Sequence, residues 1–174
     1  IAVCTPNNPT GAIMSAESMS EVRRIAEEYD LYLLSDEVYR GAELSGVESD
    51  SMYTGRQKDI INSGLSKAYR LPGLRLGWTV ADPSTIWDCW KLHDYTTIST
   101  GIVSDFIASR VLQPKRRKQL LGSTTEFLNS NLKILKNWIE SQGDLFSFIA
   151  PEAAAIAFPK YNLEIPSVDL IKKL

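Results

Sequence analysis

The chain has 174 residues, of which 44% are hydrophobic and 23% are charged, and its formal net charge is −2. This composition is typical of a soluble globular protein, and it excludes the disordered and collagen-like classes. The small net charge argues against a grip on nucleic acid or on an anionic membrane surface. Because no apolar run reaches about 18 residues, no membrane-spanning helix is expected either.

Strands and one amphipathic helix are predicted in the first half of the chain. Four short apolar runs are typical of strands: residues 1–5, 31–34, 59–62 and 76–81. The second of these runs is continuous, as in a parallel strand buried on both faces. Apolar residues at helical spacing predict a helix over residues 19–29, opened by a capping box of Ser18 and Glu21. Residues 41–57 are polar and contain glycines, which indicates a loop.

The second half is predicted to be mainly helical. One helix should begin at Asp82-Pro83-Ser84, a second should span residues 101–112, and a long one should run from Pro114 to Gly143. Two β-like stretches follow, at residues 145–149 and 154–158. The chain opens inside an apolar run and closes in the start of a helix, so we expect it to be part of a longer protein.

Two features invite functional readings that the sequence does not favour. Cys4, Cys89 and the single histidine, His93, predict neither a disulfide framework nor a metal site, and they fit a reducing, cytoplasmic setting. Residues 115–118 form the basic run KRRK directly after Pro114. Because the chain is net acidic and no aromatic residues interleave this run, we interpret it as the solvated start of a helix.

The order of elements predicts an α/β fold, a three-layer α/β/α sandwich with a mostly parallel sheet, followed by the start of a small α+β C-terminal domain. In such sheets, ligands bind beyond the carboxyl ends of the strands. Three polar pairs follow predicted strands: Asn7-Asn8, Asp36-Glu37 and Ser66-Lys67. They should therefore meet at one site.

A lysine at a strand end can carry covalent chemistry. If Lys67 is partly buried between Leu65 and Ala68, its ammonium form is disfavoured and the neutral amine can condense with an aldehyde to form a Schiff base. The Asp36 carboxylate could hold a ring nitrogen protonated, or it could simply cap a turn or pair with a lysine. The Tyr39 phenol could donate to an oxygen beside the aldehyde, or it could pack in the core.

The segment after Lys67 could bind a phosphate. Arg75 offers a fork of two parallel hydrogen bonds, and Ser66 adds a hydroxyl. Gly64 permits close approach of the backbone, and Pro72-Gly73 makes the turn that would bring Arg75 back toward the strand end. We interpret Arg70 as a surface charge.

Three motifs carry a resemblance to a known family. NNPTG (residues 7–11), SDEVY (35–39) and SKAYRLPGLRLGW (66–78) resemble, in order and spacing, the class I and II aminotransferases. These are pyridoxal-phosphate (PLP) enzymes of fold type I, the aspartate aminotransferase superfamily. The resemblance covers most of residues 1–81. It implies that Lys67 forms the Schiff base with PLP and later moves the α-proton of the substrate, and that Asp36 binds the pyridine nitrogen.

The resemblance also implies the remaining cofactor contacts. Tyr39 and Asn8 would hydrogen-bond the phenolic oxygen of PLP, and Ser66 and Arg75 would hold its phosphate. Gly64 stands where many relatives have a serine that adds a further phosphate contact. The family's glycine-containing phosphate loop and stacking aromatic ring precede these motifs, and its substrate-carboxylate arginine follows them. None of the three is found in this chain.

The implied function is transfer of an amino group from an amino acid to a 2-oxo acid, typically in a homodimer. Residues 1–113 would form the C-terminal half of the large PLP-binding domain, 114–142 the connecting long helix, and 143–174 the beginning of the small domain. Residues 96–101, TTISTG, are either an interface contact or an ordinary helix cap. The same motifs also fit a PLP-dependent C–S β-lyase or another elimination enzyme, or the ligand-sensing aminotransferase-like domain of a transcription regulator.

Overall fold

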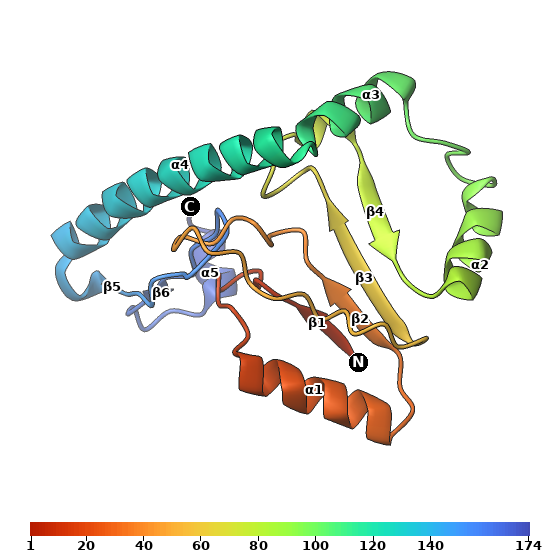
Figure 1. The fold of residues 1–174 in the computed structure, drawn as a ribbon. Coiled ribbons are helices and arrows are strands. Elements are labelled where there is room, and N and C mark those ends of the chain that lie inside the picture. Colours follow the sequence, from red (N-terminus) through yellow and green to blue (C-terminus); the bar gives the residue numbers. More distant parts are fainter.

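The computed structural model describes residues 1–174 and contains a four-stranded main sheet (Figure 1). Its strands lie in chain order: β1 (Ala2–Cys4), β2 (Leu33–Asp36), β3 (Asp59–Gly64) and β4 (Gly77–Val80). β1, β2 and β3 are parallel, whereas β4 runs antiparallel to β3. The predicted α/β class with a mostly parallel sheet is therefore confirmed. β2 extends beyond the predicted strand because Asp36 continues the ladder opposite Asn62.

Five helices accompany the sheet: α1 (Ala16–Glu28), α2 (Pro83–His93), α3 (Ile102–Val111), α4 (Pro114–Ser141) and α5 (Ser167–Ile171). The predicted capping box of α1 is wrong. Ser15 caps this helix, because its hydroxyl accepts a hydrogen bond from the Ser18 N–H at 3.2 Å. Glu21 instead pairs with Arg24 on the exposed side of α1, at 2.7 Å. None of the helices has the length and apolar character needed to cross a membrane.

One face of the sheet packs against α1. The buried residues of this contact come from α1, β2, β3 and the loop before β3: Met19, Ala26, Leu33, Met52 and Ile61. Side chains alternate along a strand, so Leu34 points to the opposite face, where it is 37% exposed. The expectation that residues 31–34 are buried on both faces is therefore wrong for this chain, because only α1 covers the strand. The sheet and one covering layer of the sandwich are present.

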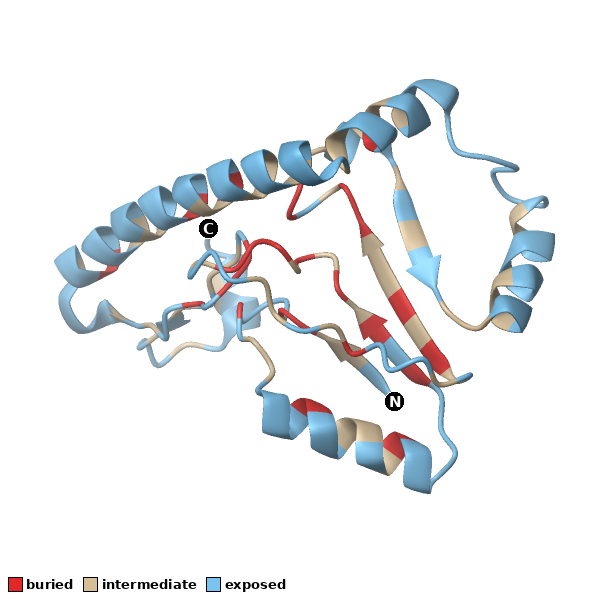
Figure 2. Cartoon of the chain, in the orientation of Figure 1, coloured by how far each residue is buried: buried red, intermediate tan, exposed pale blue.

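A second core lies at the carboxyl ends of the strands, where α3 and α4 cross them (Figure 1). Its buried residues are Ala42, Leu65, Ala68, Tyr69, Ala108 and Leu128. The turn that carries Lys67 therefore packs against α3 and α4, which follow it in the sequence. The outer surface of α4 and nearly all of α2 are exposed (Figure 2).

The C-terminal segment differs most from the prediction. β5 (Phe146–Ser147) pairs antiparallel with β6 (Lys160–Tyr161), so the predicted strand at residues 145–149 is shortened. The predicted strand at residues 154–158 is wrong. Its first residue turns back with φ +68° and donates from its backbone N–H to Ala42 O at 2.9 Å, so this segment joins the loop after β2 and not β5. The division at residues 113 and 142 stays a prediction.

Candidate active site

The end of β2 leads into a tight turn that orients Tyr39. The Asp36 carboxylate accepts a hydrogen bond from the Val38 N–H at 3.1 Å, and the Arg40 N–H donates to Glu37 O at 3.0 Å. This turn carries Tyr39 into a buried position where it is only 7% exposed. There its hydroxyl accepts a hydrogen bond from Asn8 Nδ2 at 3.3 Å. The ends of β1 and β2 therefore meet through side chains, as the sequence predicted.

The end of β3 brings Lys67 to the same place. The Ala68 N–H donates to Val38 O at 3.3 Å, which joins the Lys67 turn to the Tyr39 turn. Lys67 Nζ lies 5.9 Å from the centroid of the Tyr39 ring. Lys67, Tyr39 and Ser66 line one cavity of about 320 Å³, which we call the Lys67 hollow; α4 forms its other wall. Ser66 and Lys67 therefore lie beside Tyr39, whereas Asp36-Glu37 does not line this hollow.

Lys67 itself is exposed, so the partial burial considered for its amine is not observed in this chain. The flanking Leu65 and Ala68 are fully buried, and they hold the backbone of the turn in the second core. The long side chain of Lys67 leaves that core and extends into the open hollow. A rigid backbone with a free amine suits a residue that must reach a ligand.

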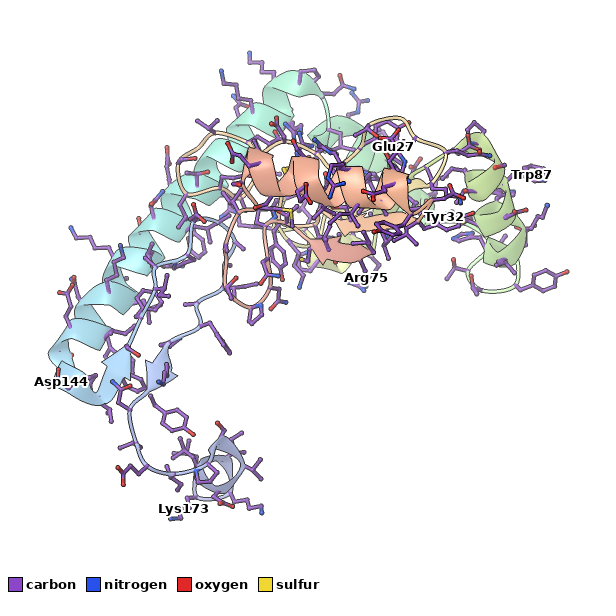
Figure 3. The ribbon with its side chains drawn as sticks, turned by 90° about the horizontal axis from the view of Figure 1, so that it is seen from below. Glu27, Tyr32, Arg75, Trp87, Asp144 and Lys173 are labelled. Atoms are coloured by element: carbon purple, nitrogen blue, oxygen red, sulfur yellow. The ribbon has the colours of Figure 1, made fainter.

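Arg75 lies outside this group. It follows the short 3₁₀ turn η1 (Pro72–Leu74), has a left-handed backbone with φ +50°, and donates from Nη1 to Pro72 O at 3.0 Å. Its side chain is at the surface of the molecule (Figure 3). Neither Arg75 nor Asp36 forms a hydrogen bond or ion pair with Lys67. Asp36 alternates with the buried Ser35 along β2, so it points away from α1.

Paired glycines close the hairpin that carries Lys67 and Arg75. A Cβ on Gly77 would lie 2.9 Å from Ser63 O, and one on Gly64 would lie 3.1 Å from Leu76 O. Gly64 thus approaches the backbone at the start of β4, and its predicted approach to a phosphate stays a prediction. β3 and β4 pair through these two glycines. Lys67 and Arg75 therefore lie in one loop whose two ends are fixed by the sheet.

The polar groups at this end of the sheet fit PLP. One Asp36 oxygen accepts from the backbone and the other is free to accept from a ring N–H. The Tyr39 hydroxyl accepts from Asn8 and so retains its own proton to donate. The Ser66 hydroxyl has no partner in the chain, and Arg75 has no acidic partner. A ring nitrogen, a phenolic oxygen and a phosphate would each find a group of matching polarity.

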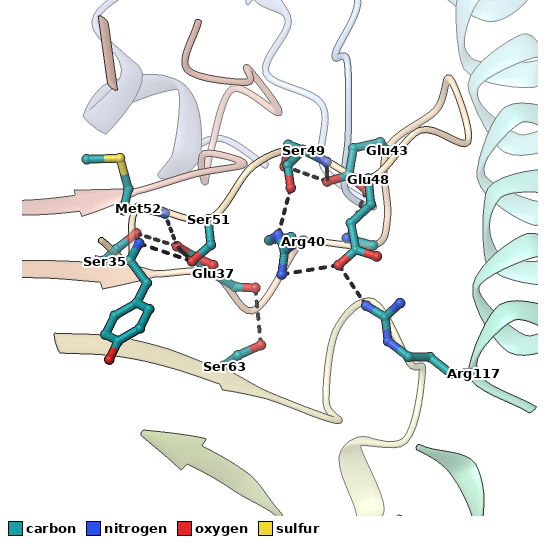
Figure 4. Close-up of polar contacts among 12 residues, drawn as sticks. Ser35, Glu37, Arg40, Glu43, Glu48, Ser49, Ser51, Met52, Ser63 and Arg117 are labelled. Atoms are coloured by element: carbon teal, nitrogen blue, oxygen red, sulfur yellow. Dashed lines mark hydrogen bonds and ion pairs between the residues drawn. The ribbon is translucent and has the colours of Figure 1, made fainter. Parts of the chain in front are cut away.

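A charged cluster that was not predicted lies behind Tyr69. Arg117 donates from Nε to the Tyr69 hydroxyl at 2.9 Å. It also donates from Nη2 to Glu48 at 2.7 Å, and Arg40 approaches the same Glu48 oxygen at 3.2 Å (Figure 4). The interpretation of residues 115–118 as a solvated run is therefore wrong for Arg117, which is partly buried. Arg117 lies on the same face of α4 as Leu121 and Leu128, and this spacing could have predicted its partial burial.

The charges of this cluster shift each other's protonation. Burial opposes ionisation of Glu48, but the hydrogen bond from Arg117 and the charges of Arg40 and Arg117 outweigh it and lower the pKa of Glu48 below its ordinary value. The hydrogen bond to Glu48 raises the pKa of Arg117, against the opposing effect of burial. Tyr69 lies two residues beyond Lys67, so the cluster fixes the turn of the candidate site from behind.

Comparison with known proteins decides the family. A profile of the family described as aminotransferase class I and II matches residues 1–173. The chain belongs to this family. The putative aminotransferase YugH of Bacillus subtilis (strain 168) is 34% identical over 113 residues, which are 62% of this chain and 28% of that protein.

Two solved structures extend this result. A PLP-dependent aminotransferase from Streptococcus suis 89-1591 is 35% identical, with a TM-score of 0.87 over 99% of this chain and 45% of its own. A PLP-bound C–S lyase from Staphylococcus hominis matches with a TM-score of 0.77 over 91% of this chain and 40% of its own. At 23% identity, the second likeness shows the fold alone. The chain spans less than half the length of each of these aminotransferase-fold proteins.

Proposed function

We propose that the full-length protein is a PLP-dependent aminotransferase that moves an amino group from an amino acid to a 2-oxo acid, with Lys67 holding the cofactor as a Schiff base. The observation that carries this proposal is the position of Lys67. Its amine extends from a buried turn into a hollow beside Tyr39, at the carboxyl ends of three parallel strands, in a chain of the aminotransferase family.

Each residue of the site takes one task in this proposal. Lys67 Nζ would receive the proton from the substrate α-carbon and deliver it to the carbon that was the aldehyde of the cofactor. PLP, when bound, supplies a ring that withdraws electrons from the substrate Cα–H bond. Asp36 keeps the ring nitrogen protonated. Tyr39, held by Asn8, donates to the phenolic oxygen.

The phosphate contacts complete the assignment. The Ser66 hydroxyl and the Arg75 guanidinium would bind the phosphate oxygens, since both lack an acidic partner in the chain. Arg75 lies at the surface, eight positions beyond Lys67 in the same hairpin. Contacts at both ends of this hairpin would hold the cofactor at its phosphate and at its aldehyde.

The test is borohydride reduction of the full-length protein followed by peptide mapping by mass spectrometry. We expect a reduced pyridoxyl-phosphate mass on the peptide that contains Lys67, and its loss in Lys67→Ala. The matched control is Lys91→Ala, which removes an exposed lysine that lies over the Trp87 ring 5.8 Å away. A label that persists in Lys67→Ala at another lysine would overturn the assignment.

A C–S β-lyase is the second candidate, because the same three motifs fit it, and a C–S lyase from Staphylococcus hominis shares the fold. Both reactions begin with removal of the α-proton by the lysine amine, so the residues above do not separate them. The two differ in their need for an acceptor. Release of a 2-oxo acid and a thiol from a thioether amino acid, with no added 2-oxo acid, would favour the lyase.

Assembly and location extend the proposal. We propose that the protein is a homodimer, because sites of this family typically lie near a subunit interface. We propose a cytoplasmic location, because the two cysteines are unpaired. Sedimentation of the full-length protein tests the dimer directly.

A further inference from the structure

A second cation, Arg70, shares the Lys67 hollow. The hollow is lined by residues of the Tyr39 turn, the Lys67 turn, α4 and the segment before β6, and none of these residues is acidic. Two cations thus face a cavity without a carboxylate, in a chain whose overall charge is negative. The hollow is therefore suited to an anionic ligand.

Arg70 is held in place without being neutralised. Its Nη2 donates to the Ser123 hydroxyl at 2.6 Å, and its guanidinium lies 5.5 Å from the centroid of the Phe127 ring. Both partners come from α4. No acidic side chain lies within ion-pair distance, whereas Arg117 on the same helix is paired with Glu48. One hydrogen bond and one ring contact leave most of the guanidinium N–H groups free to bind a carboxylate as a fork.

The backbone at Arg70 is unfavourable for an arginine. Its φ is +54°, in the left-handed region that glycine adopts without steric cost. Strained positions of this kind persist where the surrounding structure or the function requires the side chain. The Arg70 backbone is fixed by its N–H, which donates to Lys67 O at 2.9 Å. The strain therefore lies in the turn that presents both cations.

We propose that Arg70 forms an anion subsite beside Lys67, which binds the second carboxylate of a dicarboxylic amino acid or 2-oxo acid. This inference rests on the proposed function and names the substrate class of that site. The subsite shares the hollow with Ser66 but not with Arg75, which does not line it. A cavity of about 320 Å³ is large enough for the side chain of a small diacid.

The experiment compares a dicarboxylate with its monocarboxylate analogue on the full-length, cofactor-loaded protein. Calorimetry measures the binding of glutarate and of pentanoate to wild type, Arg70→Gly and Arg70→Met. Losing a charge-assisted fork should weaken glutarate binding roughly ten- to hundredfold. Pentanoate binding should change less than about twofold, since its chain carries no second charge. Glutamate turnover relative to norvaline turnover should fall by the same factor.

Two variants keep the result interpretable. Arg70→Gly also relieves the left-handed backbone, so its melting temperature should be unchanged or raised while glutarate binding falls. Arg110→Met is the matched control: Arg110 also stacks on a ring, 5.1 Å from the Phe106 centroid, but lies outside the Lys67 hollow. It should bind both probes as wild type does.

Equal losses for glutarate and pentanoate, or unchanged glutarate binding, would overturn the subsite. Failure of the proposed function would give a different result from failure of the subsite, because borohydride labelling of Lys67 does not depend on Arg70. A labelled Lys67 with no effect of Arg70 on glutarate rejects the subsite alone. An unlabelled Lys67 with glutarate binding that requires Arg70 retains the anion site and rejects the Schiff base.

Discussion

Asp36 has one carboxylate oxygen engaged by the Val38 N–H and one without a partner. In the proposed reaction the free oxygen keeps the ring nitrogen protonated, so Asp36→Ala should slow removal of the substrate α-proton. The loss of one charge-assisted hydrogen bond from the transition state predicts a fall of about tenfold or more. Exchange of the α-hydrogen for deuterium, followed by NMR on the full-length protein, measures this step.

The control for this measurement is Asp88→Ala, which removes an exposed carboxylate that pairs only with Lys91 on α2. It should exchange at the wild-type rate. If Asp36→Ala also exchanges at that rate with cofactor bound, Asp36 has no part in the electron withdrawal.

At the residue scale, the sequence predicted which groups meet but not how exposed they are. Asn8, Tyr39 and Lys67 follow three neighbouring strands, and parallel strands bring such residues to one edge of a sheet. The exposure of Lys67 depends on what covers the hollow, which no local pattern encodes. The pairing of Arg117 with Glu48, 69 positions apart, was hidden for the same reason.

The hairpin of β3 and β4 depends on glycines that lie too close to the opposite strand to be replaced. Gly77→Ala would place a Cβ 2.9 Å from Ser63 O, which is backbone and cannot rotate away. We expect a loss of about 1–3 kcal/mol in the free energy of unfolding. Gly122→Ala on α4 meets no atom within 4 Å and should stabilise by about 0.5–1 kcal/mol. Urea unfolding of the full-length protein measures both changes.

The two substitutions are matched in chemistry and opposite in expected sign. A stabilising Gly77→Ala would mean that the hairpin relaxes without cost, and Lys67 and Arg75 would then not be held at a fixed separation. Unfolding midpoints shifted in the same direction for both variants would contradict the argument.

At the element scale, helices were easier to predict than strands. The starts of α2 and α4 follow from Pro83 and Pro114, because proline at the first helical position needs no N–H partner. The predicted strand at residues 154–158 failed because strand pairing depends on a partner elsewhere in the chain. Its backbone found that partner at Ala42, across more than a hundred residues.

The whole molecule exposes 11522 Å² of surface, whereas a folded monomer of this mass exposes about 8,500 Å². Large apolar side chains contribute to this surface: on α2, Trp87 is 60% and Trp90 54% exposed, and Leu34 on the sheet is 37% exposed. Composition predicted an ordinary globular core, and periodicity located the apolar faces. Neither shows which of those faces is covered, because coverage is a property of the assembled layers.

The stability of the whole molecule should depend on pH through Glu48. Its pKa in the folded chain lies below the value of about 4.3 that it has when unfolded. Between these two values the unfolded chain binds a proton that the folded chain does not, so this stabilisation is complete above the unfolded pKa and is lost as pH falls through the folded one. Glu48→Gln should therefore cost about 1–2 kcal/mol at neutral pH and little below the folded pKa.

Urea unfolding of wild type and Glu48→Gln from pH 7 down to pH 3 measures this gap. Glu140→Gln is the control, because Glu140 is exposed on α4 and forms no ion pair. A gap between wild type and Glu48→Gln that persists unchanged at pH 3 would show that packing, and not charge, sets the cost.

The 28 residues of α4 make a helix about 42 Å long that contacts the rest of the chain at both ends. In its first half, Arg117 donates a hydrogen bond to the Tyr69 hydroxyl, and Ser123 accepts one from Arg70. Near its end, the Trp138 ring lies 5.3 Å from the Phe146 ring in β5. A tilt of about 5° pivoting near Arg117 would carry the far end roughly 3 Å, whereas Ser123, six residues from the pivot, would move by about 0.8 Å. The contacts behind the Lys67 turn lie near the end of α4 that would move least, so a tilt of this helix would disturb them last.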